Sequence, residues 1–182
     1  IFGVILLAIA VKLFATNVTK SLPILPRFGT NLILQNQYQN VNYLGRGPHE
    51  NYQDRKTSAL IGNYSAKVKD LYFPYTRPQE NGYKTDNRWV SFTDDNGKGI
   101  KVSAPNYFSF SAHHQYNADF DAGQTKQQRH AIDIKKRNLV NINIDHQQMG
   151  VGGINSWGAM PLPKYRIKPE ETSFSYKISK LK

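Results

Sequence analysis

The stretch Leu139-Val-Asn-Ile-Asn-Ile-Asp145 alternates apolar and polar side chains from Val140 onward. A period of two places apolar side chains on one face of a β-strand and polar side chains on the other. We therefore expect a strand with one buried face and one wet face. Short runs rich in Val, Ile, Phe and Tyr recur along the chain and predict further strands. All the predicted strands are Ile5–Phe14, Asn31–Gln35, Val41–Leu44, Trp89–Thr93, Ile100–Ala104, Tyr107–Ala112, Arg129–Ile134, Leu139–Asp145 and Ser173–Ile178.

The segments between these runs also favour an all-β, mostly antiparallel fold. Asp94-Asp-Asn-Gly97 is typical of a hairpin turn, because Asn and Gly accept positive φ. The one helical candidate is a polar turn or two at Gln115–Ala122. The connections at Gly45–Arg55, Tyr72–Lys84 and Met149–Lys164 are longer than the two to five residues of an ordinary hairpin. Long connections of this kind usually carry function or form interfaces.

The length of 182 residues, with 39% hydrophobic side chains, fits one folded domain over residues 1–182. We expect residues 1–20 to hold a leading strand and residues 21–182 to form the body. The apolar run Ile1–Ala10 is shorter than the roughly twenty residues that span a bilayer. It also lacks the Met and basic start of a signal peptide. We interpret it as a buried strand in a fragment of a larger protein, with no membrane partner.

The formal net charge of +11 raises nucleic acid as a partner. The Lys and Arg residues are scattered, however, and Lys135-Lys-Arg137 is the only tight cluster, which favours a solvated basic surface and no nucleic-acid partner. The chain has no cysteine, which excludes disulfides, thiolate zinc sites and a cysteine nucleophile. The compartment, cytoplasmic or periplasmic, stays open.

Four motifs carry a resemblance to a known family. In order they are Leu25-Pro-Arg-Phe-Gly29, Tyr43-Leu-Gly-Arg-Gly-Pro-His-Glu-Asn-Tyr-Gln-Asp-Arg55, Pro74-Tyr-Thr-Arg-Pro-Gln-Glu-Asn-Gly82 and Met149-Gly-Val-Gly-Gly-Ile-Asn-Ser-Trp157. From about Leu22 onward the chain resembles the C-terminal domain, or small chain, of bacterial β-galactosidases of glycoside hydrolase family 2. The resemblance implies a large β-sandwich, or supersandwich, of the galactose-mutarotase-like kind, within an enzyme that hydrolyses terminal β-D-galactosides with retention.

The resemblance also implies what this chain lacks. The catalytic glutamates of the family lie in a central β/α barrel, so we expect no catalytic residue here and no activity from the chain alone. The expected partners are the remaining domains, a β-galactoside substrate and further copies in a homo-oligomer. Magnesium and sodium in the family are bound mainly by other domains, so we assign no cofactor and no metal ligand here.

The glutamates support this interpretation from the residues themselves. Retaining hydrolysis needs two carboxyl groups about 5 Å apart, and the chain has four glutamates. Glu170 and Glu171 lie in a Lys-rich turn. We predict that Glu50, Asp54 and Arg55 form a hydrogen-bonded network that fixes the Gly45–Arg55 loop.

Glu80 and Asn81 are expected to cap turns in the next motif, so Glu80 belongs with the same structural network rather than with catalysis.

Trp157 is the strongest candidate for substrate binding. A pyranose packs its apolar face on an indole ring while its hydroxyls bond nearby polar groups. Trp157 follows the turn-forming glycines Gly150–Gly153, which lack the pattern of a phosphate-binding loop. We expect these glycines to turn the backbone sharply, so that the loop presents the ring at the surface rather than burying it. It also matches the place where the family's C-terminal domain lends a tryptophan to the rim of the active site. Asn155 and Ser156 are candidate sugar contacts beside it, although Ile154-Asn155 departs from the acidic residues of the enterobacterial pattern. Trp89 opens a predicted strand and is expected in the core.

The histidines carry no recognisable metal pattern, and His113 and His114 are expected to point to opposite faces of a strand. Two alternative functions stay open. A free-standing carbohydrate-binding module would expose two or three coplanar aromatic rings, and a sugar mutarotase would need a catalytic His and Glu, which no motif here provides.

Overall fold

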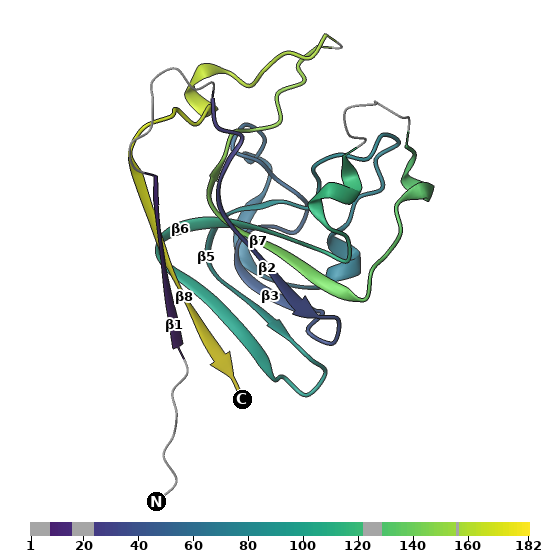
Figure 1. The fold of residues 1–182 in the computed structure, drawn as a ribbon, viewed down its shortest axis with the longest axis vertical. Coiled ribbons are helices and arrows are strands. Elements are labelled where there is room, and N and C mark those ends of the chain that lie inside the picture. The colour runs from purple at the N-terminus through teal and green to yellow at the C-terminus, as the bar shows by residue number, and fades with distance from the viewer. Residues whose placement is uncertain (1–7, 16–23, 122–128, 156) are drawn as a thin grey trace, which may run out of the picture.

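The computed structural model describes residues 8–15, 24–121, 129–155 and 157–182, which form one eight-stranded antiparallel sheet (Figure 1). The strands are β1 (Ala8–Ala15), β2 (Arg27–Gln35), β3 (Asn40–Gly47), β4 (Leu60–Lys67), β5 (Lys84–Thr93), β6 (Gly99–His113), β7 (Leu139–Gln148) and β8 (Thr172–Leu181). The described helices are short 3₁₀ turns, namely η1 (Val68–Leu71), η2 (Asn117–Phe120), η3 (Ala131–Asp133) and η4 (Pro163–Tyr165). In this part of the chain no helix is long and apolar enough to cross a membrane. The all-β, antiparallel prediction is confirmed.

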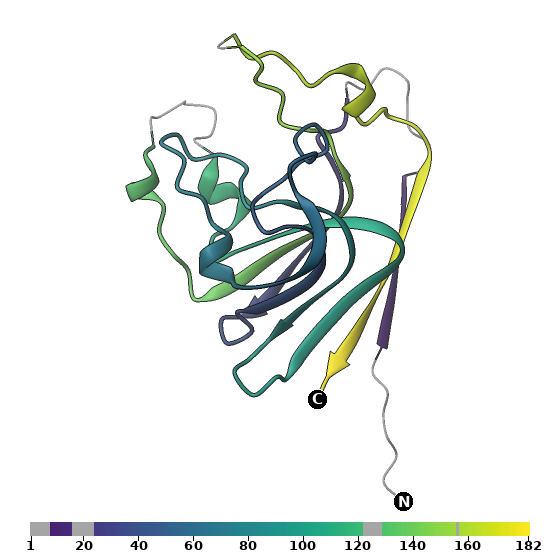
Figure 2. The same ribbon diagram turned by 180° about the vertical axis from the view of Figure 1, so that it is seen from behind.

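The sheet forks at β6, the longest strand. Its first part, Gly99–Ser103, pairs with β8, which in turn pairs with the edge strand β1. Its last part, Ser109–His113, pairs with β7, which pairs with the other edge strand β2. On its opposite side β6 pairs with β5, and the sheet continues through β3 to β4. Figure 2 shows the resulting curvature from behind, with the long loops gathered at one end of the sheet.

The core fills the inside of this curve with side chains from β3, β5, β6, β7 and β8. Its fully buried members are mostly aromatic and β-branched, as expected for strands packed on one face. They include Val41, Tyr43, Val90, Phe92, Val102, Phe110, Ile142, Ile144, Phe174 and Tyr176. The hydroxyls of Thr30 on β2 and Tyr176 on β8 lie 2.6 Å apart, and this hydrogen bond joins the two branches of the fork.

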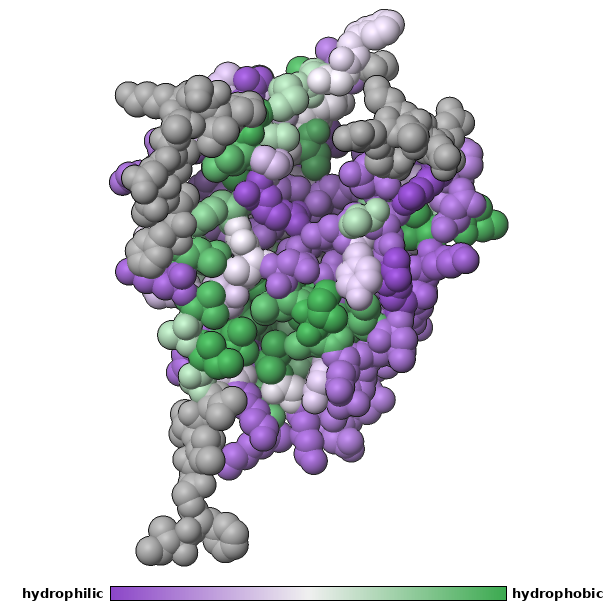
Figure 3. All heavy atoms as spheres, viewed as in Figure 1, coloured by the Kyte–Doolittle hydropathy of each residue, from purple (hydrophilic) through white to green (hydrophobic). Residues whose placement is uncertain are grey.

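An apolar patch remains on the face where the two branches diverge. Half-buried side chains of β1, β2 and β8 pack on the edge of the core there, and Figure 3 shows apolar surface between β1 and β2. These residues are Val11, Leu13, Leu32, Leu34 and Ile178. Patches of this kind on a protein surface often mark an interface.

Several sequence predictions hold and others are corrected. The Asp94–Gly97 hairpin turn is confirmed, with the Gly97 N–H donating to Asp94 O at 3.1 Å. The two runs predicted at Ile100–Ala104 and Tyr107–Ala112 are one strand, β6. The strand β4 was not predicted, because an edge strand with little burial has no clear alternation in its sequence. Residues 5–7 of the predicted Ile5–Phe14 strand lie outside the described residues, and β1 begins at Ala8. The prediction that the Ile1–Ala10 run is buried is wrong for Ala8–Ala10, which are exposed because β1 is an edge strand.

The prediction of a strand at Arg129–Ile134 is wrong. The segment forms the 3₁₀ turn η3, because two hydrogen bonds join its ends. The Asp133 carboxylate accepts the His130 backbone N–H at 2.8 Å, and the Asp133 backbone N–H donates to His130 O. These local hydrogen bonds compete with sheet formation. The helical candidate at Gln115–Ala122 is confirmed only as the single turn η2.

The expectation of a wet face on β7 is also wrong. Asn141, Asn143 and Asp145 are as buried as the apolar residues between them. The Asn143 amide donates to Ser111 Oγ at 3.0 Å, and the Asn31 amide donates to Asn141 Oδ1 at 2.6 Å. Buried polar side chains are stable when they are hydrogen-bonded to one another, so the alternation identified the strand but not the environment of its polar face. Trp89 is half-buried rather than in the core, with Lys101 Nζ 4.4 Å from its ring centroid.

Candidate functional site

The four sequence motifs meet around one cavity of about 520 Å³. The first motif contributes the segment before β2, and the second and third contribute the loops after β3 and before β5. The fourth contributes the connection after β7. The lining residues are Pro26, Glu50, Tyr52, Arg55, Tyr75, Gln79, Glu80, Gln148 and Met149–Gly153. Motifs far apart in sequence therefore build one site at the loop end of the sheet.

Glu50 is tied to its surroundings through both carboxylate oxygens. Oε2 accepts the backbone N–H of Gly82 at 2.7 Å and the hydroxyl of Tyr52 at 3.5 Å, and Oε1 accepts the hydroxyl of Tyr75. The side chain thus joins the second motif loop to the third. A carboxylate held by three donors is poorly placed to act as a nucleophile.

Glu80 shares the cavity with Glu50 but is held by a cation. Its Oε2 lies 2.9 Å from Nη2 of Arg27, and Nε of the same guanidinium lies 3.1 Å from the fully buried carboxylate of Asp145. Burial raises the pKa of Glu80, and Arg27 opposes that shift. Burial likewise raises the pKa of Asp145 to about 7, although Arg27 lowers it. Glu80 therefore belongs to a partly buried ion cluster with Arg27 and Asp145 rather than to a turn cap.

Asp54 and Arg55 contact the fourth motif rather than each other. The Asp54 carboxylate accepts the backbone N–H groups of Val151 and Gly152 at 3.1 and 2.8 Å. The Arg55 guanidinium donates to the carbonyl oxygen of Gly152. Within the described residues, no ion pair within 4 Å joins Arg55 to Asp54 or Glu50. Both side chains hold the connection that carries Trp157.

A glycine is required where this contact is made. A Cβ built on Gly150 lies 2.4 Å from Cγ of Asp54, so a side chain at this position displaces the carboxylate. Farther along the connection, Gly152, Gly153 and Gly158 have φ values of +62°, +67° and +75°. Such angles favour glycine. The glycines thus permit both the close approach of Asp54 and the sharp turns before and after Trp157.

Trp157 lies at the outer part of this connection and is 91% exposed. The expectation that the loop presents the ring rather than burying it is confirmed. The Asn155 side chain accepts the backbone N–H groups of Trp157 at 2.9 Å and Ala159 at 3.3 Å, so its oxygen already stabilises the turn. Ser156 lies outside the described residues. The sugar-binding roles of Trp157, Asn155 and Ser156 stay predictions.

A buried lysine next to the cavity was not singled out from the sequence. Lys84, at the start of β5, is 2% exposed, and its Nζ donates to Gly82 O at 3.2 Å. Burial lowers the pKa of Lys84 to about 8, while Glu50 opposes the shift. His113, also buried, bonds to the side chain of Asn81 at 3.0 Å, and burial lowers its pKa to about 4. The other adjacent histidine, His114, bonds to Leu139 O at 2.7 Å.

Arg27, Tyr75, Asp145 and Gln148 were also not predicted as site residues. The first two lie inside the recognised motifs, which was the only signal available for them. Asp145 and Gln148 lie in the second half of β7, and nothing in their local sequence distinguishes them. In the part of the chain that the structure describes, no group of three or more His, Asp or Glu side chains is arranged to hold a metal ion.

Comparison with known proteins identifies the family. A family model described as "Beta galactosidase small chain" matches residues 6–178. The chain belongs to this family. It is 32% identical over 149 residues to a β-galactosidase of Priestia megaterium. The aligned region is 82% of this chain and 14% of that protein. It is 36% identical over 146 residues to a β-galactosidase of Vibrio cholerae. The aligned region is 80% of this chain and 13% of that protein.

A β-galactosidase of Streptococcus thermophilus is 34% identical over 159 residues, or 87% of this chain and 15% of that protein. The small-chain domain described here thus spans about one seventh of the length of these relatives. The aligned regions are parts of larger β-galactosidases.

Proposed function

We propose that this small-chain domain forms the C-terminal part of a retaining family 2 β-galactosidase and completes the mouth of its active site. The substrate is a terminal β-D-galactoside, and the acid/base and nucleophile glutamates come from another domain. The domain has the galactose-mutarotase-like supersandwich fold and packs against neighbouring domains in a homo-oligomeric enzyme. Trp157 stacks on the apolar face of the sugar.

The observation that carries this proposal is an exposed tryptophan on an anchored loop. An indole held in water costs free energy, since burial of an aromatic ring is worth about 25 cal/mol per Å². The loop is nevertheless fixed at its base by Asp54 and Arg55, which orders the backbone without burying the ring. A fixed backbone that holds the Trp157 ring in solvent suits a residue whose binding contact forms when substrate is present.

Apolar surface around Trp157 supports packing against the rest of an enzyme. The same connection exposes Val151, Ile154, Met160 and Leu162, and Ile154 is 79% exposed. The apolar patch between β1 and β2 is a second surface of this kind. A small domain in isolation rarely exposes so much apolar surface.

A free-standing carbohydrate-binding module is the weaker alternative. Such a module would present several coplanar rings, whereas the ring pairs of the described residues do not include Trp157. The mutarotase alternative has no specific support either, because His113 is buried against Asn81 and does not line the motif cavity. An exposed Trp157 that stands apart from these ring pairs, beside apolar surface, favours a domain that completes another site.

The proposal is tested with Trp157→Ala and Trp157→Phe in the complete enzyme. We expect the alanine variant to weaken galactoside binding by roughly 1–3 kcal/mol, the scale of one lost stacking surface, and the phenylalanine variant to recover part of it. The exposed aromatic Tyr107 on β6 provides a control as Tyr107→Ala. Steady-state kinetics are paired with thermal unfolding. A Trp157→Ala enzyme that binds normally but melts much earlier contradicts the proposal.

A further inference from the structure

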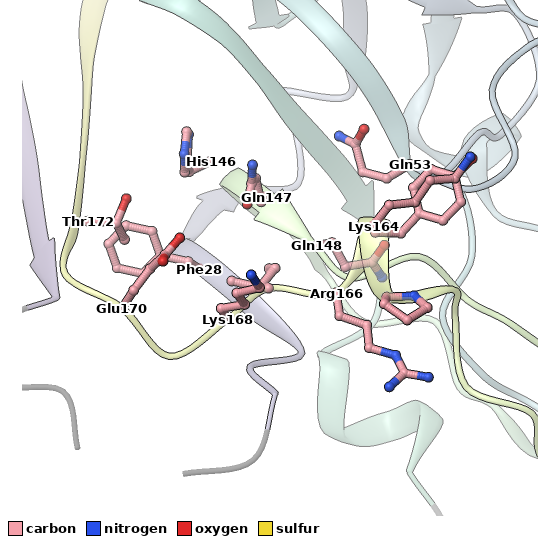
Figure 4. Close-up of a pocket in the computed structure, with 13 residues that line it drawn as sticks. Phe28, Gln53, His146, Gln147, Gln148, Lys164, Arg166, Lys168, Glu170 and Thr172 are labelled. Carbon is pink, nitrogen blue, oxygen red and sulfur yellow. The ribbon is translucent and has the colours of Figure 1, made fainter. Parts of the chain in front are cut away.

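A second cavity, of about 550 Å³, lies beside the motif cavity, and Gln148 lines both. It is formed between the end of β7, the start of β2 and the segment from η4 to β8. Figure 4 shows His146, Gln147 and Gln148 from β7 facing Lys168, Glu170 and Thr172 of that segment. Its volume is in the range of small-molecule sites.

The lining combines amides with ring surface. Gln53, Gln147 and Gln148 contribute three side-chain amides from two separate segments of the chain. Phe28, His146 and Tyr165 contribute aromatic surface, and His146 packs on Phe174 with the ring centroids 5.5 Å apart. Amides that both donate and accept, next to ring faces, match the hydroxyls and the apolar face of a sugar.

One of these amides has an unmet hydrogen bond. Gln148 is 8% exposed, and its Oε1 is buried with no hydrogen-bond partner among the described residues. A buried acceptor without a partner costs about 1–3 kcal/mol. Oε1 is closed off from the cavity as well as from solvent, so a ligand hydroxyl becomes its donor once the amide turns toward the cavity. The Gln53 amide differs from that of Gln148, because its Oε1 already accepts a hydrogen bond from Lys56 Nζ at 3.1 Å. Its N–H groups are the part that can donate to a ligand.

Three cations, Lys164, Arg166 and Lys168, and one carboxylate, Glu170, line the cavity, so an anion is the competing ligand. Lys164 Nζ lies over the ring of Tyr165, 4.8 Å from its centroid, and Arg166 Nε donates to Pro161 O at 2.6 Å. These two cations therefore already have partners. Lys168 and Glu170 are exposed, line the same cavity and carry opposite charges.

We infer that this cavity is an accessory site for one neutral pyranose, held by Gln53, Gln147 and Gln148 against the rings of Phe28 and Tyr165. The inference goes beyond the proposed function, because it needs neither Trp157 nor hydrolysis. The accessory site and the proposed function can therefore fail separately in experiment.

The test is a ¹⁵N–¹H NMR titration of the 182-residue chain with D-galactose, D-glucose and methyl β-D-galactoside, and with D-galacturonate as an anionic probe. We expect at least one neutral sugar to shift the side-chain amide signals of Gln53, Gln147 and Gln148 at millimolar concentration. Gln147→Leu should weaken that binding by roughly fivefold to tenfold, the scale of one or two hydrogen bonds. Gln37→Leu is the matched control, because Gln37 is also an exposed glutamine and lines neither this cavity nor the motif cavity.

Three results overturn the inference. The first is the absence of shifts at these glutamines with every neutral sugar. The second is shifts that disappear in Trp157→Ala, which would place the sugar on the other loop. The third is tighter binding of D-galacturonate than of D-galactose, which would assign the cavity to an anion. Gln53→Leu provides a second variant if Gln147→Leu does not fold, and the amide spectrum itself reports folding.

Discussion

Asp54 accepts the backbone N–H of Gly152 at 2.8 Å, although the two residues are 98 positions apart in the sequence. This hydrogen bond and its neighbour to Val151 fasten the connection after β7 to the loop after β3. Asp54 was predicted to fix its own loop, and in the structure it fixes the loop that carries Trp157. If Trp157 contacts substrate, Asp54 is a positioning residue that acts through it.

Asp54→Ala in the complete enzyme should therefore raise KM for a galactoside by about tenfold, equivalent to ~1.4 kcal/mol, with a smaller effect on the melting temperature. The reason is that two backbone donors lose a charged acceptor and the loop loosens. Asp95→Ala is the control, because Asp95 also accepts two hydrogen bonds but lies in the distant hairpin after β5.

A double mutant separates a positioning role from a general structural role. Residues that act through one another give non-additive effects. The Asp54→Ala/Trp157→Ala enzyme should bind substrate about as weakly as Trp157→Ala alone. Additive losses in binding would show that Asp54 acts independently of Trp157.

Arg55→Ala should have only a small effect on thermal unfolding, under about 1 kcal/mol. The predicted network of Glu50, Asp54 and Arg55 would give the loss of about 3–5 kcal/mol that accompanies a broken buried ion pair. In the structure, however, Arg55 is exposed and donates to a backbone carbonyl. Denaturant unfolding of the 182-residue chain measures this difference. A loss of several kcal/mol would mean that Arg55 makes a buried electrostatic contribution.

Lys84→Met should remove a pH-dependent part of the stability. The pKa of Lys84 is about 8 in the folded chain, against an ordinary value of 10.5, because of burial. Between these two values the unfolded chain binds a proton that the folded chain does not, so the free energy of unfolding of the wild type rises with pH through this window. Below pH 8 the charged lysine destabilises the fold, by an amount on the order of 3 kcal/mol at 1.36 kcal/mol per unit.

The methionine variant should therefore be more stable than the wild type near pH 7, and the two should converge toward pH 10.5. Urea unfolding at a series of pH values checks this. The groups facing Lys84, Glu50 and His113, stay in place in both proteins. A constant difference across the window would show that Lys84 titrates normally in the folded state.

The 182-residue chain alone should hydrolyse no galactoside. Glu50 and Glu80 are the two carboxylates of the motif cavity, and both are held by donors from the fold. An assay with a chromogenic β-galactoside should give no turnover above background. Robust turnover that disappears in Glu50→Gln or Glu80→Gln would place the chemistry in this domain instead.

The sequence by itself determined the fold class and the family. Alternation in runs such as Val41–Leu44 and Leu139–Asp145 predicted strands, because the two faces of a strand meet different surroundings. The glycine-rich fourth motif predicted an exposed Trp157, since residues without side chains cannot build a core around it. Strand alternation and a glycine-rich turn are both local properties of the chain. They can be recognised without knowing which distant residues pack against them.

The tertiary structure alone decided which side chains meet. The burial of Asn141, Asn143 and Asp145 depends on what covers the second face of β7, which no period of two can state. The weakly patterned edge strand β4 is held by hydrogen bonds to β3 rather than by burial. The contacts of Asp54 with Gly152, and of Arg27 with Glu80 and Asp145, join segments from 53 to 118 positions apart. Such contacts arise only when the sheet brings its loops to one end.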